Sequence, residues 1–296
     1  IAIGTLYGVT GTLNMADMAV KIQALSGDQA MLAKAGALML LIVFGLKAAL
    51  LPLHFWLPQA YSTTSGVVAA LFAIMTKVGV YSIIRVYTLI FGADANELAL
   101  VAHDWLWVMG LLTMLAGALG ILAARDLRLM VAYLVVISVG TILTAYSLFS
   151  TQTTGAALFY LVHSTFVTGA LFLLADVMAF ERGKTASRIV SGKRMANHST
   201  YAVMFLVAAV AVIGLPPLSG FVSKLMILES ASANGHNFWL WAAIIGATFI
   251  MLVAVTRAGS KMIWHTLSGK PSEQSAPLGK RAALASLLLL SILNGF

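Results

Sequence analysis

Four basic side chains lie inside long apolar runs of the sequence, where a charge is costly. Lys47 is in FGLKAALLPLHFWLPQAY, Lys77 is in LFAIMTKVGVYSIIRVY, and His163 is in FYLVHSTFVTGALFLLAD. Lys224 follows the segment GLPPLSG by a few residues. Insertion scales assign a cost of about 2.5 to 3.5 kcal/mol to a lysine at the centre of a membrane-spanning helix. A purely structural helix has no reason to bear that cost, so these groups are candidates for chemistry.

The chemistry open to buried amines and imidazoles is proton exchange. Burial and neighbouring positive charges weaken the hold of a lysine on its proton, so such a group can exchange it near neutral pH. We therefore expect Lys47, Lys77, His163 and Lys224 to form a proton pathway. The structural alternative for each lysine is a stem that reaches the lipid headgroups. For the histidine, the alternative is packing against a neighbouring helix.

A second set of polar side chains accompanies these four. It consists of His54, Ser164, Thr165 and Thr168. The three hydroxyl residues follow His163 on the same run, and His54 lies two residues after Pro52, where it could bond a broken backbone or accept a proton from Lys47. Of the ten acidic residues, only Asp176 falls well inside an apolar run, near its end. The lysines thus lack a carboxylate partner, which upstream helices or a neighbouring subunit would have to supply.

The elements that position these groups are expected to be membrane-spanning helices. Hydrophobic residues make up 60% of the 296 positions and charged residues only 9%, a composition that an ordinary soluble core cannot accommodate. The apolar runs are about 20 to 27 residues long, which lets a helix cross a hydrocarbon layer of about 30 Å. They are continuous rather than alternating, which argues against barrel strands. The predicted fold class is an all-α, polytopic transmembrane bundle.

Seven complete spans are predicted, with a partial span at each end of the sequence. They cover residues 33–59, 66–91, 104–124, 127–149, 155–180, 201–228 and 238–264. The connections are short, so residues 1–296 are expected to form a single transmembrane domain. The partial spans indicate a fragment of a longer chain.

Lysine and arginine are distributed unevenly among the connections. Most of the 18 such residues gather around positions 125–128, 182–194 and 257–281. The alternate connections hold none, and these are 92–103, 150–154 and 229–237. The positive-inside rule assigns the basic connections to the cytoplasmic side. Because this topology accounts for the net charge of +8, no nucleic-acid partner is expected.

Two of the spans contain residues that interrupt a helix. The predicted breaks are at Pro52, Pro58, Gly214, Pro216 and Pro217. A proline removes a backbone donor, and hydrocarbon cannot satisfy the carbonyl that is left, so the break must face protein or a wet cavity. Paired broken helices are typical of ion carriers built from repeats. Simple kinking is the structural alternative, but each break here has a lysine nearby.

Other kinds of chemistry have no support in the sequence. With no cysteine, the chain cannot form disulfides, thiolate zinc sites or iron–sulfur ligation. There is no phosphate-binding glycine loop, no metal-type histidine pair and no convincing hydrolase triad, so we expect no metal, no cofactor and no enzyme active site. Three glycines, Gly110, Gly117 and Gly120, are expected to allow close helix packing.

The same segments resemble a known family. GLKAALLPLHFWLPQAY, ALFAIMTKVGVYSIIRVY, RDLRLMVAYLVVISVG, LVHSTFVTGALFLLAD and GLPPLSGFVSKLMILESA are similar to the antiporter-like membrane subunits shared by Mrp-type cation/proton antiporters and respiratory complex I. The resemblance covers essentially the whole chain. LYGVTGTLNMADM and VHSTFV look more like the D-type subunit of the Mrp (Pha, Mnh) antiporters than like a complex I subunit.

The resemblance implies a fold of about fourteen helices with two inverted repeats, each holding a discontinuous helix. This truncated chain would run from about helix 6 to helix 14. Lys47 would be the lysine of the broken seventh helix, Lys77 that of the eighth, His163 the histidine of the eleventh and Lys224 the charge of the broken twelfth. Many relatives have a further lysine in the eleventh helix where this sequence has Thr168, so hydroxyls and water would have to link His163 with Lys224.

The function implied is that of a proton-conducting, energy-coupling subunit of a multisubunit Na⁺ or K⁺/proton antiporter in the bacterial inner membrane. Its partners would be sister subunits, the two transported ions and membrane lipid. The alternative is a proton-pumping membrane subunit of NADH:quinone oxidoreductase. A third alternative is a structural membrane scaffold whose polar residues serve only packing.

Overall fold

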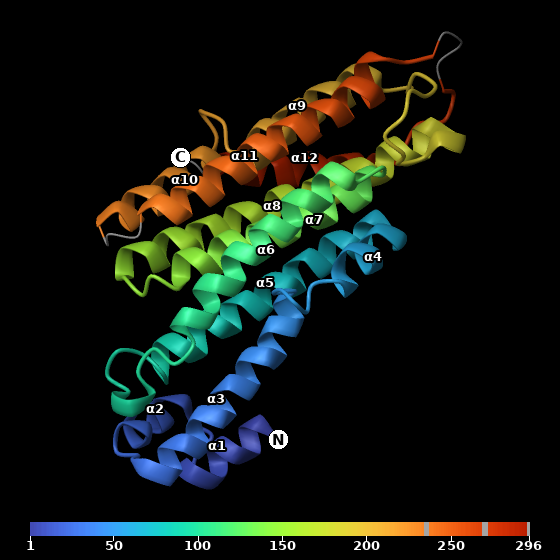
Figure 1. Ribbon diagram of the computed structural model, residues 1–296. Helices are drawn as coiled ribbons and strands as arrows, with labels where there is room; N and C mark the ends of the chain where they lie inside the picture. Colours follow the sequence, from blue (N-terminus) through green and yellow to red (C-terminus); the bar gives the residue numbers. More distant parts are fainter. Residues whose placement is uncertain (234–236, 268–271, 295–296) are drawn as a thin grey trace.

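The structure, a computed structural model, describes residues 1–233, 237–267 and 272–294 as a bundle of helices (Figure 1). Six helices of this part are long and apolar enough to cross a membrane. They are α3 (Gly27–Ala48), α5 (Gly66–Leu89), α6 (His103–Ala123), α7 (Leu127–Tyr146), α8 (Thr151–Arg182) and α11 (Asn237–Gly259). The shorter α-helices are α1 (Ala2–Thr10), α2 (Met15–Gln23), α4 (Trp56–Thr63), α9 (His198–Ile213), α10 (Ser219–Ala233) and α12 (Leu278–Leu293). The predicted all-α membrane bundle is confirmed.

The helices follow the order of the predicted spans, but several of their ends differ. Helix α8 begins at Thr151 rather than at position 155, because Ser150 and Thr153 form a reciprocal capping box. Helix α12, the partial span at the end of the sequence, begins at Leu278 directly after Pro277, whose fixed φ suits a helix start. Sequence hydropathy locates the apolar centre of a span, whereas capping residues decide where the helix begins.

Helix α7 is the centre of the bundle and is buried along almost its whole length. Glycines bring α6 and α7 close together. A methyl group on Gly110 would lie 2.9 Å from the backbone nitrogen of Thr144, and one on Gly117 would lie 2.9 Å from that of Ile137. A Cβ on Gly120 would overlap the ring of Tyr133. The predicted role of these glycines in close packing is confirmed.

The first predicted break lies between α3 and α4. Helix α3 ends at Ala48, and Ala49 adopts a left-handed backbone with φ of 58°. The freed backbone groups find partners in the protein: the N–H of Leu51 donates to the hydroxyl of Thr113 at 2.9 Å, and the indole of Trp56 donates to the carbonyl of Leu46 at 3.0 Å. The predicted span over 33–59 is thus two helices with a break between them. Helix α3 begins at Gly27 rather than at 33, and α4 ends at Thr63 rather than at 59.

The prediction that Pro58 breaks the helix is wrong. Pro58 is the third residue of α4, which runs from Trp56 to Thr63. The first turn of a helix needs no intrahelical N–H donor, so a proline is tolerated there. The break lies earlier, around Pro52.

The second predicted break separates α9 from α10 and is confirmed at Gly214, Pro216 and Pro217. Gly214 ends α9 in the left-handed conformation with φ of 81°. A side chain on this residue would approach the carbonyl of Gly220 to 3.0 Å, so glycine suits both the backbone and the space. Because α9 ends at this break, its last carbonyls have no N–H partner within the helix. Other elements of the bundle must supply hydrogen-bond donors to them.

A carboxylate joins four helices at the end of the bundle that carries the basic connections. Asp176 of α8 accepts hydrogen bonds from Arg128 of α7 and Lys280 of α12, both at 2.7 Å, and from the backbone N–H of Gly66 at 3.2 Å. Gly66 begins α5. Asp176 is therefore a structural link between helices far apart in sequence.

Candidate functional site

Lys77 lies in the middle of α5 and is almost completely buried, with 2% of its surface exposed. Its ammonium donates a hydrogen bond to the hydroxyl of Ser138 on α7. Ser138 in turn donates to the carbonyl of Val135 at 2.6 Å. The lysine side chain is thus held by a neutral hydroxyl and cannot reach the lipid headgroups. For Lys77, the structure therefore excludes the alternative of a stem that reaches the lipid headgroups.

His163 of α8 is bonded on both ring nitrogens. Nδ1 lies 2.7 Å from the hydroxyl of Ser219, the first residue of α10, and Nε2 lies 3.1 Å from the carbonyl of Ala211 on α9. Ser219 also donates to the carbonyl of Ser291 on α12 at 2.6 Å. His163 therefore contacts both sides of the second helix break, and through Ser219 it is connected to α12.

The three contacts around His163 together need three protons. The hydroxyl of Ser219 supplies one, and an imidazolium supplies the other two, because both of its ring nitrogens are donors. A neutral imidazole has only one N–H, so the hydroxyl of Ser219 must then bond either Nδ1 of His163 or the carbonyl of Ser291. All three contacts are hydrogen bonds at once only when the ring is an imidazolium, and a neutral ring leaves one of them without a proton.

Lys224 of α10 folds back on the second break. Its ammonium donates to the carbonyl of Ile213 at 2.7 Å and to the hydroxyl of Thr248 on α11 at 2.9 Å, and only 7% of the residue is exposed. Ile213 is the last residue of α9. The C-terminal end of a helix carries a partial negative charge, so the end of α9 takes the place of a carboxylate.

Lys47 is placed differently from the other three basic groups. It lies in the last turn of α3, directly before the first break, and its side chain is exposed on the surface of the described chain. It lines a small cavity of about 150 Å³ together with Tyr61 and Thr76. The hydroxyls of Tyr61 and Thr76 are hydrogen-bonded to each other. Gly79 of α5 packs against the backbone of Lys47.

The second set of predicted polar residues is only partly brought to the site. His54 is buried in the first break, and its Nδ1 has no hydrogen-bond partner among the described residues. The hydroxyls of Ser164 and Thr168 bond carbonyls of their own helix, at 3.1 and 2.6 Å. Thr165 does the same at 2.7 Å. These residues therefore lie near His163 along α8 but are not its hydrogen-bond partners.

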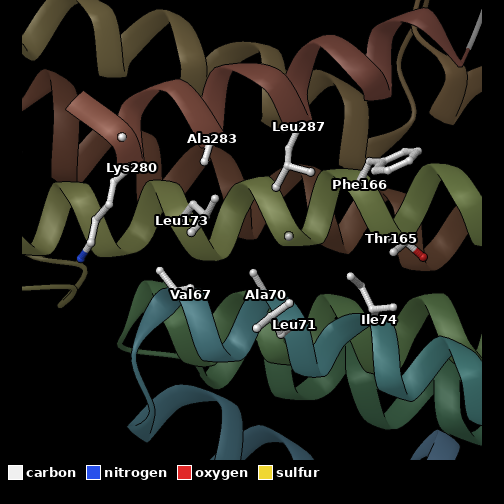
Figure 2. A pocket seen from close by; sticks show the side chains of 12 residues that line it. Val67, Ala70, Leu71, Ile74, Thr165, Phe166, Leu173, Lys280, Ala283 and Leu287 are labelled. Atoms are coloured by element: carbon white, nitrogen blue, oxygen red, sulfur yellow. The ribbon is translucent and has the colours of Figure 1, made fainter. Parts of the chain in front are cut away.

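Thr165 faces an apolar cleft between α5, α8 and α12 instead (Figure 2). The cleft has a volume of about 400 Å³ and is lined by aliphatic side chains such as Ile74, Leu173 and Leu287. Lys280 lies at one end of it, where its ammonium is paired with Asp176. The lining offers little to bind an ion, so this cleft is not a candidate for the chemistry.

Three hydroxyl residues of the site were not singled out from the sequence as site residues. They are Ser138, Ser219 and Thr248, the partners of Lys77, His163 and Lys224. The position of Ser219 in LPPLSG, directly after a break, was a usable signal, because a helix that starts inside the membrane exposes polar groups at its end. No local signal identifies Ser138 or Thr248.

Acidic partners and metal ligands are absent from this region of the described chain. No carboxylate lies within ion-pair distance of Lys47, Lys77 or Lys224 there. Nor do the described residues include a group of three or more histidine, aspartate or glutamate side chains that could hold a metal ion. What the arrangement can do is hold and pass protons between amines, an imidazole, hydroxyls and helix ends.

The fold and the site define a polytopic membrane protein with two broken helices, two buried basic groups beside the second break and an exposed lysine beside the first. The sequence matches the family described as "NADH:quinone oxidoreductase/Mrp antiporter, TM" over residues 1–251. The chain belongs to this family.

Curated relatives are bacterial antiporter subunits. The chain is 37% identical to the D-type subunit of the Na(+)/H(+) antiporter of Bacillus subtilis, over the whole chain and 59% of the relative. It is 35% identical to the D-type subunit of the probable K(+)/H(+) antiporter of Rhizobium meliloti, over 91% of the chain and 55% of the relative. The chain thus spans somewhat more than half the length of these relatives. With the six apolar helices, they assign it to the multi-pass proteins of the bacterial plasma membrane.

Solved structures have the same fold. A chain of the Mrp complex from Dietzia sp. DQ12-45-1b superposes with a TM-score of 0.83 at 25% identity, over 99% of this chain and 61% of the other. A chain of respiratory complex I from Thermus thermophilus with bound NADH superposes with a TM-score of 0.80, also at 25% identity, over 99% and 60%. The antiporter-like fold expected from the sequence is confirmed.

Proposed function

We propose that this chain is part of the proton-conducting, energy-coupling membrane subunit of a multisubunit monovalent cation/proton antiporter, with Lys47, Lys77, His163 and Lys224 as its proton pathway. The cation would be Na⁺ or K⁺, the ions named for the curated relatives. Sister subunits and membrane lipid would be its partners. On this proposal the chain is a transporter subunit and not an enzyme.

The observation that carries the proposal is the environment of the buried basic groups. Lys77, His163 and Lys224 are each nine-tenths or more buried, and each is bonded to neutral groups or helix ends among the described residues. A permanent charge in such a place is expensive, whereas a charge that comes and goes is accommodated. A structural role alone would be served better by apolar side chains.

Lys224 and His163 also each have a hydrogen-bond acceptor at the end of α9. The charge on Lys224 is stabilised by the C-terminal end of α9, and Nε2 of His163 points at the same helix end. Two positive charges that share one helix end repel each other, so loading one group favours release from the other. This repulsion couples neighbouring steps of a proton transfer without a carboxylate.

A replacement of Lys47 tests the proposal. In inverted membrane vesicles that contain the assembled complex, we expect Lys47→Ala to abolish cation-dependent proton exchange while the complex still assembles. The matched control is Lys21→Ala, because Lys21 is an exposed lysine on α2 that is paired with Asp17. Exchange at the wild-type rate in Lys47→Ala, with assembly intact, would reject the proposed function.

The alternative function is that of a proton-pumping membrane subunit of NADH:quinone oxidoreductase. The likeness to complex I of Thermus thermophilus favours it, because that complex has a chain of the same fold. The two functions differ in their partners. Purification of the intact complex with flavin and iron–sulfur subunits would support the alternative, and purification without them supports the antiporter.

A further inference from the structure

The apolar cleft between α5, α8 and α12 continues along the side of the bundle. A second cavity of about 320 Å³ lies between α5 and α8 and shares Ile74, Thr165 and Phe166 with the cleft. Along α5 the combined lining extends from Val67 to Tyr81, which corresponds to about 21 Å of helix. Half of a hydrocarbon layer of about 30 Å is about 15 Å. The cleft and its continuation are therefore long enough for one acyl chain of a lipid.

Small residues from all three helices keep the cleft open. They are Ala70 of α5, Gly169 of α8 and Ala283 of α12. A Cβ on Gly169 would lie 3.5 Å from Cδ1 of Leu287 and 4.0 Å from Cβ of Ala70, so the missing side chain leaves space where the helices meet. On the rim, Leu71 is 58% exposed. A narrow apolar space that opens to the membrane suits an unbranched hydrocarbon chain.

One end of the cleft carries positive charge. Lys280 lies there (Figure 2), and its side chain is 40% exposed. Its ammonium bonds Asp176 at 2.7 Å, but an ammonium has three donors and can bond a second anion at the same time. Arg128 pairs with the same carboxylate at 2.7 Å. Two cations thus face one carboxylate, and this end of the cleft favours a further negative group.

The start of α12 adds to this preference. Gly279 lines the same end of the cleft and is the second residue of α12, a helix of 16 residues. Backbone N–H groups in the first turn of a helix lack intrahelical acceptors, and the partial positive charge there favours an anion. This end of the bundle carries the basic connections, which the positive-inside rule assigns to the cytoplasmic side. Basic pockets between membrane helices on that side bind anionic lipid headgroups.

We propose that the cleft between α5, α8 and α12 is a binding site for an anionic phospholipid of the cytoplasmic leaflet. The acyl chain lies among Ile74, Leu173 and Leu287, and the phosphate is bound by Lys280 and the start of α12. The bound lipid contacts both α5 and α8, which carry Lys77 and His163. The site goes beyond the proposed function, because it depends on the position of the chain in the membrane and not on ion exchange.

The test uses the full-length subunit in its assembled complex, reconstituted into phosphatidylcholine vesicles. One sample contains a small fraction of phosphatidylglycerol with a diazirine on its acyl chain. A second sample contains phosphatidylcholine with the same photoreactive chain. After irradiation, the labelled peptides of this chain are identified and quantified by mass spectrometry. We expect the peptides with residues 67–74 and 165–173 to be labelled at least fivefold more by the anionic probe. The outer face of α11 serves as reference, because Phe249 is 64% exposed there, and the two probes should label it equally.

Two variants separate the headgroup from the acyl chain. Lys280→Gln should lower labelling of the cleft by the anionic probe about fivefold, which corresponds to about 1 kcal/mol, and should leave labelling by the neutral probe unchanged. Its control is Lys184→Gln, an exposed lysine in the connection after α8. Ala283→Phe fills the cleft and should lower labelling by both probes at least fivefold. Its control is Ala285→Phe, at an exposed position of α12 outside the cleft lining.

Three results would overturn the proposal. The first is equal labelling of the cleft by the two probes in the unchanged complex. The second is an effect of Lys280→Gln no larger than that of Lys184→Gln. The third is labelling of α11 without labelling of the cleft, since another helix of the complex then covers it. Ala283→Phe leaves the ion pair of Lys280 with Asp176 in place, so it tests the cleft even where Lys280→Gln disturbs the fold. Labelling does not require ion exchange, so failure of the proposed function leaves this test unaffected.

Discussion

His163 and Ser219 show which hydrogen bonds a buried imidazole makes in this bundle without a carboxylate. The two ring nitrogens face a hydroxyl and a backbone carbonyl, and the hydroxyl has a second acceptor in Ser291. On the proposed function, this hydroxyl can turn between its two acceptors as the ring gains or loses a proton. Lys224 uses the same helix end, through the carbonyl of Ile213. Neutral hydrogen-bonding groups that reorient over a short distance are suited to a neighbouring group that takes up and releases a proton repeatedly.

Ser138 provides a prediction at this scale. Hydrogen bonds to charged groups contribute about 1.5 to 3 kcal/mol, and tenfold in a rate or equilibrium corresponds to about 1.4 kcal/mol. Loss of the hydroxyl that holds Lys77 should therefore lower the exchange rate by about tenfold or more in Ser138→Ala. Ser138→Thr, which keeps a hydroxyl, should restore much of the rate.

Proton exchange in inverted vesicles is the measurement for this prediction, normalised to the amount of assembled complex. Ser82→Ala is the matched control, because Ser82 is on the same helix as Lys77 but bonds only the carbonyl of Val78 in its own helix. Equal rates in Ser138→Ala and Ser82→Ala would show that Ser138 does not hold Lys77 in a functional position.

At the scale of elements, the broken helices place their C-terminal ends beside the basic groups. Helix α3 ends one residue after Lys47, and α9 ends where Lys224 and His163 meet its carbonyls. These ends can be accommodated inside the membrane because side chains from α6 and α10 satisfy the freed backbone groups. The close packing of α6 on α7 keeps the central helix in place between the two breaks.

The packing of α6 on α7 predicts the effect of a single methyl group. A Cβ on Gly140 of α7 would lie 2.6 Å from the backbone nitrogen of Met114 and 2.7 Å from the carbonyl of Gly110. Backbone atoms cannot move aside as a flexible side chain can, so Gly140→Ala should destabilise the subunit by about 1 to 3 kcal/mol. The thermal unfolding midpoint of the purified complex should fall accordingly.

The control for Gly140 is another glycine in a transmembrane helix. A methyl group on Gly246 of α11 would meet nothing within 4 Å, so Gly246→Ala should leave the unfolding midpoint unchanged or raise it slightly. An unchanged midpoint in Gly140→Ala would mean that α6 and α7 are further apart than the structure shows.

At the scale of the whole molecule, Asp176 holds together helices that carry different parts of the site. It links α5, with Lys77, to α8, with His163, and both to α7 and α12. Its partners Arg128 and Lys280 have 20% and 40% of their side chains exposed, so solvent screens part of the attraction. The link lies at the end of the bundle that carries the basic connections.

Asp176→Asn removes this link with little change in shape. We expect the free energy of unfolding to fall by about 1 to 3 kcal/mol, because two charged donors lose their ionic acceptor. Asp17→Asn is the control, since it breaks the exposed pair with Lys21 and should change stability very little. Both are measured as thermal unfolding midpoints of the complex, and equal midpoints would contradict the structural role of Asp176.

The sequence by itself determined the membrane helices, the two interrupted spans and the basic residues near them. Hydropathy and proline are local properties, and lysine in an apolar run stands out without knowledge of its neighbours. Pro58 shows the limit of this reasoning, because the same residue breaks a helix in its middle and is accepted in its first turn. The roles of the four basic residues remain a prediction.

Only the tertiary structure decided what each basic residue contacts. Ser219 lies 56 residues from His163 along the chain, and Ser138 lies 61 residues from Lys77. Such pairs depend on how helices pack, and a serine in an apolar helix gives no local indication of its partner. The tertiary structure also placed the end of α9 beside Lys224, where a helix dipole takes the role that the sequence had left to a missing carboxylate.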